Sequence, residues 1–425
     1  MRKFELPNGW EYKSLYDLVD IIGGVSYSPS DITTSGVRII RGGNIQDNIV
    51  LLRDDDVYLP SSYKCANNTL RKGDIILVAS TGSVDALGRT ATVWEDMEDV
   101  QIGAFLRILR PKEKKYERFL SATLSGSFYL NYIKTVAKGT SINNISQSHI
   151  KNFRIPVPSD DELTKISDLY ASLSERINLD REINQNLEAF AEQLYNYWFV
   201  QFDFPDVSGR PYKTSGGKMI WNEKLKRDIP EGWEDRPLNA VSEIVNGATP
   251  STEDPGNYGG DIVWITPKDL SNQKSKFTYF GERNITQKGY DSCSTALVGE
   301  DTILMSSRAP IGLLSIAKCD LCTNQGFKSI EPKDRDNTPF LYYYIKQHLP
   351  QIEKLGSGTT FKEVSRGDME GFPILIPEST VLKKWTDLVK DVFKKQFSLY
   401  SEVVDLTKIR DELLPLLMTG QVIIS

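Results

Sequence analysis

Nearly the same hexapeptide occurs twice in this chain, as LPNGWE at positions 6–11 and as IPEGWE at positions 229–234. The match continues, so that LPNGWEYKSLYDLVDIIGG aligns with IPEGWEDRPLNAVSEIVNG at a constant offset of 223 residues. Further along, GTSINNISQSHIKNFRIPVP aligns with GTTFKEVSRGDMEGFPILIP at an offset of 219 residues. The matches fall on Gly, Pro and apolar positions, which determine backbone conformation and core packing. The chain is therefore predicted to contain two copies of one fold.

Each copy contains short β-rich segments that end at Gly, Pro, Ser or Asp, such as VRIIRGG and DIILVAS in the first and DIVWITP and DTILMSS in the second. Short helices are expected at YERFLSATLSGSFYLNYIKTV and at TPFLYYYIKQHLPQIEKL. Each copy is thus predicted to be a compact α+β domain. The polar residues between the shared positions differ freely, which is expected if each copy presents a different surface to a different target. Simple drift after duplication is the alternative.

A long helical pattern follows each copy. Between positions 161 and 199 apolar residues recur at spacings of three and four, with a single gap of six, and the segment contains no Gly or Pro. The last segment of the chain repeats this pattern at the offset of 219. A helix of about 40 residues is about 60 Å long, too long for one small domain to cover. Each helix is therefore predicted to pair with the other, with Asp180 and Asn184 near the seam. Two separate helices, each packed on its own domain, are the alternative.

The predicted fold class is α+β: two similar globular domains separated by a pair of long antiparallel helices, a coiled-coil spacer, with a pseudo-twofold internal repeat. The predicted boundaries are 1–158 for the first globular domain, 159–202 for the central helix, 203–378 for a connector and the second globular domain, and 379–425 for the C-terminal helix.

Composition restricts location and partners. No apolar stretch is long enough for a membrane-spanning helix, and the N-terminus does not resemble a signal peptide, so a cytoplasmic protein is expected. The four cysteines have no framework spacing and are expected to be reduced structural thiols. The net charge of −6 means that any nucleic-acid surface must be local.

No catalytic motif is present. The sequence lacks a phosphate-binding GxxxxGK[ST] loop, a GxGxxG motif after a strand and the Asn/Asp-Pro-Pro-aromatic tetrad of amino-methyltransferases. His149 and His348 are the only histidines, too few for a His-rich metal site. A nuclease-like pattern at Asp320 and Glu331 to Lys333 has no acidic counterpart in the first copy. By elimination the chain is predicted to bind rather than to catalyse, with no metal site.

Several segments together resemble one known family. They are the twin PNGWE and PEGWE starts, WITPKDL at 264–270, SSRAPIG at 306–312, TNQGFK at 323–328, the connector GRPYKTSGGKMIWNEKLKRDIPEGWE and the ending LLPLLMTGQV. The chain is similar over its full length to the specificity subunits of type I restriction and modification systems. The first domain fits more loosely, because STGSVDALGRTA and VQIGAFL depart from the patterns of the second.

The resemblance implies that each globular domain is a target recognition domain that reads one half of an interrupted DNA sequence, while the paired helices set the spacer between the halves. It implies two methyltransferase subunits docked on the helical region and motor-nuclease subunits that complete the restriction enzyme. S-adenosylmethionine, ATP and magnesium would act only in those partner subunits.

Side chains with fixed donor and acceptor geometry read bases, Arg on guanine and Asn or Gln on adenine, when loops carry them to a groove. The predicted DNA-binding residues of the first domain are Arg41, Asn44, Ser83, Arg89, Gln101, Ser141, Asn143, Asn144 and Lys151. Those of the second domain are Lys268, Ser307, Arg308, Asn324, Gln325, Thr359, Thr360 and Lys362. Each has an alternative interpretation as a loop-stabilising or solvated side chain.

An aromatic run at the end of the central helix is a candidate docking surface for a partner subunit, with a hydrophobic cap on the helix pair as the alternative. Its residues are Tyr195, Trp198, Phe199 and Phe202. The competing function is a two-headed scaffold that binds other proteins and has no DNA specificity.

Overall fold

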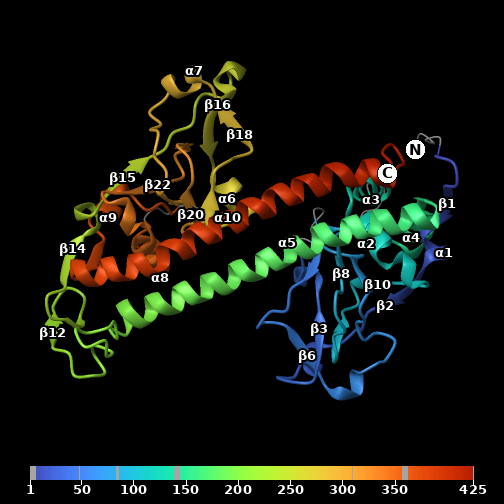
Figure 1. Cartoon of the computed structure of the whole chain (residues 1–425), viewed down its shortest axis with the longest axis horizontal. Helices are drawn as coiled ribbons and strands as arrows, with labels where there is room; N and C mark the ends of the chain where they lie inside the picture. The colour runs from blue at the N-terminus through green and yellow to red at the C-terminus, as the bar shows by residue number, and fades with distance from the viewer. Residues whose placement is uncertain are drawn as a thin grey trace. The chain divides into compact units, whose positions relative to one another are not determined.

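The computed structural model describes residues 6–46, 48–82, 86–137, 144–308, 310–356 and 362–424. The chain divides into two compact units, of which unit 1 contains Met1–Leu179 with Val403–Ser425 and unit 2 contains Asp180–Glu402. Figure 1 shows the two long helices, α5 in green and α10 in red. They span Asp160–Tyr195 and Ser379–Met418, so each unit contains one copy of the repeat and a part of both helices.

Unit 1 is built on a four-stranded sheet with the order β2-β10-β7-β8 and a three-stranded sheet with the order β6-β3-β9. The strands of the first are β2 Val19–Gly23, β10 Leu106–Pro111, β7 Ile75–Val78 and β8 Thr90–Thr92. Those of the second are β6 Val57–Leu59, β3 Val37–Ile40 and β9 Val100–Ile102. Two pairs complete the unit, β1 Glu11–Ser14 with β11 Arg154–Val157 and β4 Ile45–Gln46 with β5 Ile49–Val50. Its helices are α1 Leu15–Leu18, α2 Glu117–Ser125, α3 Ser127–Ala137 and α4 Gln147–Asn152.

Unit 2 repeats this plan with a five-stranded sheet, β15-β22-β19-β20-β17, and a three-stranded sheet, β18-β16-β21. The strands of the first are β15 Ser242–Asn246, β22 Lys328–Pro332, β19 Ile303–Met305, β20 Leu314–Ala317 and β17 Phe277–Thr278. Those of the second are β18 Arg283–Ile285, β16 Tyr258–Ile265 and β21 Cys322–Thr323. The strand pairs are β14 Glu234–Pro237 with β23 Pro373–Ile376 and β12 Met219–Asn222 with β13 Arg227–Pro230. Its helices are α6 Pro267–Gln273, α7 Gln287–Asp291, α8 Thr338–Leu355 and α9 Arg366–Glu370.

Corresponding hydrogen bonds show that the two units share one topology. The backbone N–H of Leu15 donates to the carbonyl of Phe153, and that of Leu238 donates to the carbonyl of Phe372, each at 2.8 Å. In both units a strand of the three-stranded sheet pairs in parallel with its neighbour, β3 with β9 and β16 with β21. The predicted α+β class and the internal repeat are confirmed.

Gly24 and Gly247, which the repeat aligns, have the same structural role. A Cβ atom on Gly24 would lie 2.1 Å from the carbonyl oxygen of Gly103, and one on Gly247 would lie 2.2 Å from that of Asn324. Both distances are far below contact distance, so only glycine permits this close approach of two backbones. The next residue in each unit adds a backbone hydrogen bond. The N–H of Val25 donates to the carbonyl of Ile102, and the N–H of Ala248 donates to the carbonyl of Thr323.

The long helices pack against each other within each unit. In unit 2 the Asn184 side-chain amide donates to the carbonyl of Gln396 at 3.2 Å, and the rings of Tyr195 and Trp385 lie 5.9 Å apart. Because the residue numbers rise along one helix and fall along the other, the helices run antiparallel there. In unit 1, α5 and α10 contribute apolar side chains to one core. The predicted antiparallel pairing is confirmed, and Asn184 lies at the seam.

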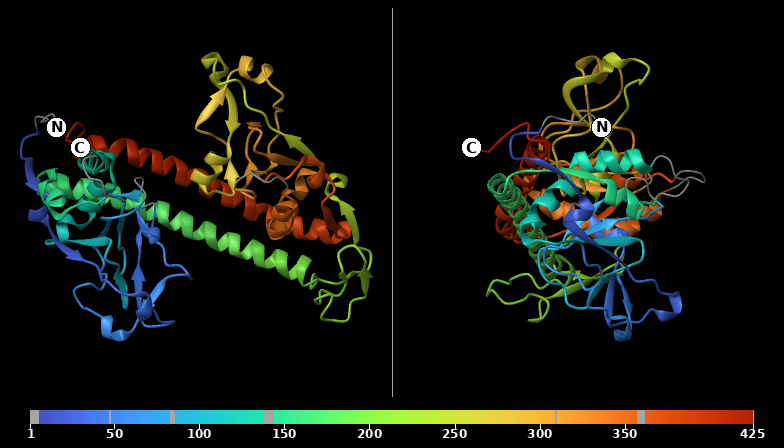
Figure 2. Two further views of the ribbon diagram at one scale, coloured as in Figure 1. Left: turned by 180° about the vertical axis from the view of Figure 1, so that it is seen from behind. Right: turned by 90° about the vertical axis from the view of Figure 1, so that its right-hand side faces the viewer.

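In unit 1 the segment that follows α10 lies against the segment that precedes β1. The end of α10 lies near β1 in Figure 1, and Figure 2 shows the same region from behind. A Cβ atom on Gly420 would lie 2.5 Å from the Pro7 side chain. In unit 2 the connector takes the corresponding place. Phe202 and Phe204 pack there on Trp233, with ring centres 5.4 and 5.3 Å away.

Candidate nucleic-acid interface

Backbone hydrogen bonds bring four segments of unit 2 to one place. The N–H of Ser307 donates to the carbonyl of Gly326 at 2.7 Å, and the N–H of Val364 donates to the carbonyl of Ser307 at 3.0 Å. The N–H of Asn324 donates to the carbonyl of Ile265, the last residue of β16, at 3.0 Å. The structure thus assembles side chains that the sequence spreads over almost 100 positions. The predicted residues in this group are Lys268, Ser307, Arg308, Asn324, Gln325 and Lys362.

An ion-pair network holds one arginine of this group. Glu363 accepts from Arg308 at 3.0 Å and from Lys328 at 3.1 Å. Burial alone would raise the pKa of Glu363, but hydrogen bonds from Arg308 and Lys328 lower it. The side chain of Lys328 is only 8% exposed, whereas that of Arg308 is 46% exposed. Arg308 is therefore held in a defined position while part of its guanidinium still faces solvent.

Two members of the group stabilise the loops. Ser307 is fully buried, so its side chain cannot reach a ligand in this structure. The carboxamide oxygen of Asn324 accepts from the N–H of Gly326 at 2.8 Å and closes the turn before β22. For these two residues the alternative interpretation, a loop-stabilising role, describes what the structure shows.

The other three members are exposed. Lys268 pairs with Glu282 at 2.7 Å, Gln325 accepts from the hydroxyl of Thr249, and Lys362 lies beside Glu363. Together with Arg308 they form a polar surface around the turn, which provides cationic and amide donors of the kind that contact phosphates and base edges.

In unit 1 the equivalent segments meet in the same way. The N–H of Gly103 donates to the carbonyl of Ile40 at 2.9 Å, and the N–H of Ile145 donates to the carbonyl of Ala79 at 2.7 Å. This places exposed Arg41, Arg89 and Asn144 around the ends of β3 and β7. Arg41 donates to the carbonyl of Asp55 at 3.0 Å.

The remaining described residues of the unit 1 prediction lie in other surroundings. Asn44 is buried and donates to Asp56 at 2.6 Å, and Gln101 is fully buried and donates to the carbonyl of Tyr63 at 3.2 Å. Both hold loops, as the alternative interpretation has it. Lys151 lies on α4, with its ammonium group 4.4 Å from the ring centre of Tyr16.

Five predicted residues lie outside the described part of the chain. They are Ser83, Ser141, Asn143, Thr359 and Thr360.

The aromatic run at the end of α5 is not a surface. Tyr195, Trp198, Phe199 and Phe202 are between 1% and 6% exposed and belong to the core of unit 2. Trp198 and Phe199 lie in the π-helical turn Asn196–Val200 at the helix end, and Phe202 of the connector packs on Trp233. These side chains are buried in this structure, which agrees with the alternative, a hydrophobic cap on the helix pair.

Sequence reasoning missed three residues of this region. Glu363 pairs with Arg308, Lys328 pairs with Glu363, and Phe105 is 69% exposed in the unit 1 turn that corresponds to Gln325 and Gly326. The carbonyl of Phe105 accepts from the N–H groups of Ala79 and Ser80, each at 3.0 Å. The signal that could have identified Phe105 is the large apolar residue in GAFL where the second copy has only NQG.

Neither a group of metal ligands nor a disulfide is found among the described residues. Among them no three His, Cys, Asp or Glu side chains are grouped as they would be around a metal ion. All four cysteines are free thiols. In the portion of the chain that the structure describes, no helix combines the length and apolarity required to span a bilayer.

Comparison with known proteins identifies the family. The family model described as the type I restriction modification DNA specificity domain matches residues 7–189 and 230–400, once in each copy of the repeat. The type I restriction enzyme HindI specificity subunit of Haemophilus influenzae is 24% identical over 446 residues, which cover 89% of this chain and 95% of that relative. The MjaIX specificity subunit of Methanocaldococcus jannaschii is 36% identical over 204 residues, which cover 45% of this chain and 47% of that relative. This second match therefore spans about half of the relative's length.

A solved structure shows the same fold. The S subunit of a type I restriction-modification system from M. genitalium aligns with a TM-score of 0.60 and 17% sequence identity, covering 98% of both chains. Taken with the two family matches, this places the chain in the family of type I restriction-modification DNA specificity domains, of which it carries two copies.

Proposed function

We propose that this chain is the sequence-recognition subunit of a type I restriction-modification enzyme, in which each globular domain reads one half of a bipartite DNA target. The recognition domains are assigned to 1–158 and 203–378, and the helices at 159–202 and 379–425 to setting the spacer and docking two methyltransferase subunits. The chain itself carries no catalytic residue. Methylation with S-adenosylmethionine, and cleavage driven by ATP with magnesium, belong to the methyltransferase and motor-nuclease partners.

One observation carries the proposal: equivalent loops on one shared scaffold present different polar side chains. Gly103 and Asn324 make the same backbone hydrogen bond to the end of a strand, and Ile145 and Val364 do likewise. Beside them unit 1 presents Asn144 where unit 2 presents Glu363. Two domains that recognise different base sequences require a shared backbone that carries different donors and acceptors. Base contacts and not phosphate contacts specify sequence.

The acidic net charge is consistent with this division of labour. The chain carries a formal charge of −6, so it lacks the excess of positive charge that drives strong phosphate binding. Partner subunits are proposed to supply most phosphate contacts, while this chain selects the sequence. Weak, salt-sensitive DNA binding is expected for the chain alone and tight binding for the complex.

The test is a selection of bound duplexes from a random pool, with and without the methyltransferase partner. Two short invariant blocks at a fixed spacing are expected. Arg41→Gln should relax one block and Arg308→Gln the other, whereas Arg366→Gln should change neither. Arg366 is a matched control, since it is 47% exposed against 46% for Arg308 and pairs with Glu370 at 2.6 Å.

Selected duplexes without any shared sequence would contradict the proposal and favour a two-headed protein scaffold. Relaxation of both blocks by a single substitution would contradict the assignment of one block to each domain. Methylation or cleavage of DNA by the isolated chain would contradict the absence of catalysis.

A further inference from the structure

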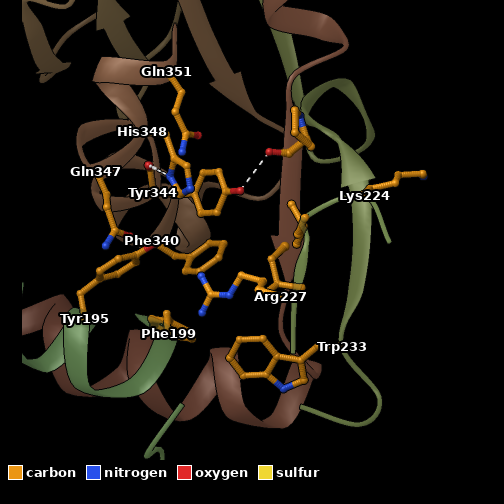
Figure 3. A pocket seen from close by; sticks show the side chains of 13 residues that line it. Tyr195, Phe199, Lys224, Arg227, Trp233, Phe340, Tyr344, Gln347, His348 and Gln351 are labelled. Atoms are coloured by element: carbon orange, nitrogen blue, oxygen red, sulfur yellow. Dashed lines mark hydrogen bonds between the residues drawn. The ribbon is translucent and has the colours of Figure 1, made fainter. Parts of the chain in front are cut away.

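Unit 2 contains a pocket of about 280 Å³ on the side of α8 that faces β13 and β23. Figure 3 shows its side chains, which come from the end of α5, the β12–β13 hairpin, α8 and β23. Its walls are mainly aromatic or aliphatic. The lining residues that carry the argument are Phe199, Arg227, Phe340, Tyr344, His348 and Gln351.

Arg227 is the central polar group of the pocket. Figure 3 shows its guanidinium directed toward the rings of Phe199 and Phe340. One of its N–H groups donates to the carbonyl of Val200 at 3.1 Å, and the guanidinium lies 4.5 Å from the ring centre of Phe202. Arginine has five N–H donors, so most of them have no acceptor in these contacts.

Within residues 310–356 and the other described ranges, no carboxylate lies within ion-pair distance of Arg227. Burial lowers the pKa of its guanidinium, which remains charged because the ordinary value is far above neutrality. A partly buried cation without a counter-ion is costly, and such groups are normally paired. The site therefore has the electrostatic character of an anion site.

The other polar groups of the pocket lining carry no negative charge. The described pocket lining contains no Asp or Glu. His348 donates through Nδ1 to the carbonyl of Tyr344 at 2.8 Å, and burial lowers its pKa, so at neutral pH its Nε2 is an acceptor and gives a carboxylate no hydrogen bond. Gln351 is exposed and offers an amide donor at the rim. Lys224 also lines the pocket, but it already pairs with Asp235 at 2.7 Å.

We propose that this pocket binds a carboxylate carried on a short aromatic or apolar stem. The planar guanidinium fork matches the two oxygens of a carboxylate, and the aromatic walls match the stem. The volume accommodates a group of about the size of one amino-acid side chain. A DNA backbone is too broad to insert a phosphate into so narrow a pocket. The carboxylate comes either from a free organic acid or from the end of a protein chain, and both sources share the same chemistry.

The experiment is titration calorimetry on the full chain with 3-phenylpropionate, its amide and inorganic phosphate. A second arm uses a tetrapeptide that ends in Phe, once with a free carboxylate and once amidated. We expect saturable binding of the carboxylates and none of the amides. A peptide that binds more tightly than 3-phenylpropionate assigns the site to a protein terminus, and the reverse order assigns it to a free acid.

Substitutions test whether the carboxylates bind in this pocket. Arg227→Gln should weaken the binding by roughly tenfold or more, because a charge-assisted bidentate contact is lost. Gln351→Glu should weaken it similarly by placing a negative charge at the rim, and this exposed side chain has no part in the core. Arg210→Gln, the matched control, should leave it within about twofold, because Arg210 lies outside the pocket lining and is already paired with Asp206. Equal binding of acid and amide, equal binding of phosphate, absence of saturable binding, or identical affinities for Arg227→Gln and the natural chain would each overturn the proposal.

Discussion

The ammonium group of Lys276 connects three elements of unit 2. Its Nζ lies 2.7 Å from a Glu188 carboxylate oxygen on α5, 2.9 Å from the hydroxyl of Tyr343 on α8 and 3.1 Å from the side-chain oxygen of Gln396 on α10. The Lys276 side chain is only 11% exposed. The contact between the globular part of unit 2 and both long helices thus includes a buried charge.

Glu188→Gln should destabilise unit 2 strongly. Burial lowers the pKa of Lys276 to about 8, so its ammonium form at neutral pH depends on the Glu188 carboxylate. Without that charge, a buried cation would remain unpaired or would have to lose its proton, and breaking a buried pair in this way costs about 3–5 kcal/mol. Lys276→Met should cost less, about 1–3 kcal/mol, because Glu188 keeps a second cation, Lys346, at 3.1 Å.

The measurement is urea denaturation of the full chain, followed by tryptophan fluorescence and by far-ultraviolet circular dichroism. Lys383→Met on α10 is the control, since its pair with Asp387 is exposed and should contribute no more than about 0.5 kcal/mol. The reasoning is refuted if Glu188→Gln costs less than about 1 kcal/mol, or if Lys276→Met costs more than Glu188→Gln.

Three further predictions concern acid stability, a glycine contact and DNA selectivity. Burial alone would raise the pKa of Glu188, but the neighbouring lysines and Gln396 lower it to about 2 from 4.5, so its stabilisation is full above about pH 4.5 and is lost as pH falls toward 2. The difference in unfolding free energy between the natural chain and Glu188→Gln should therefore shrink by about 3 kcal/mol over that range, and a constant difference would contradict this. Gly24→Ala, whose Cβ would meet a backbone oxygen at 2.1 Å, should cost about 1–3 kcal/mol in urea denaturation, whereas Gly23→Ala, with open space around it, should cost less than about 0.5 kcal/mol. Glu363→Gln removes the carboxylate that holds Arg308, so duplex selection should show relaxed base preference in one block only, and an unchanged block would argue against this positioning role.

Much of the fold could be predicted because the Gly, Pro and apolar residues that determine backbone and core are recognisable in the sequence. The constant offset between the copies predicts two equal folds, and Gly24 and Gly247 align because both permit the same close backbone contact. Segments such as VRIIRGG and DIILVAS are indeed strands, β3 and β7. The predicted helix that begins at Tyr116 is interrupted at Gly126, which separates α2 from α3.

Pairings between distant positions could not be predicted in this way. Lys276 precedes a two-residue strand, and its partners on α5 and α10 are 88 and 120 residues away. Such partners decide whether a polar side chain is buried and stabilises a loop, or is exposed and can donate a hydrogen bond to a ligand. For this reason Gln101 and Ser307, both chosen as base-contacting residues, proved to be fully buried.

Pairing between side chains from distant positions also explains how two equal scaffolds can present different surfaces. Asn144 and Glu363 occupy corresponding loops, next to Ile145 and Val364, which make matching backbone hydrogen bonds. Glu363 places a carboxylate there that holds Arg308, whereas Asn144 is a neutral amide and cannot hold a cation in the same manner. One change at one loop position therefore alters which neighbouring side chain is fixed for contact, while the strands beneath stay as they are. Specificity can diverge between the two copies without any cost to the shared core, because the residues that support the loops and the residues that face outward are different ones.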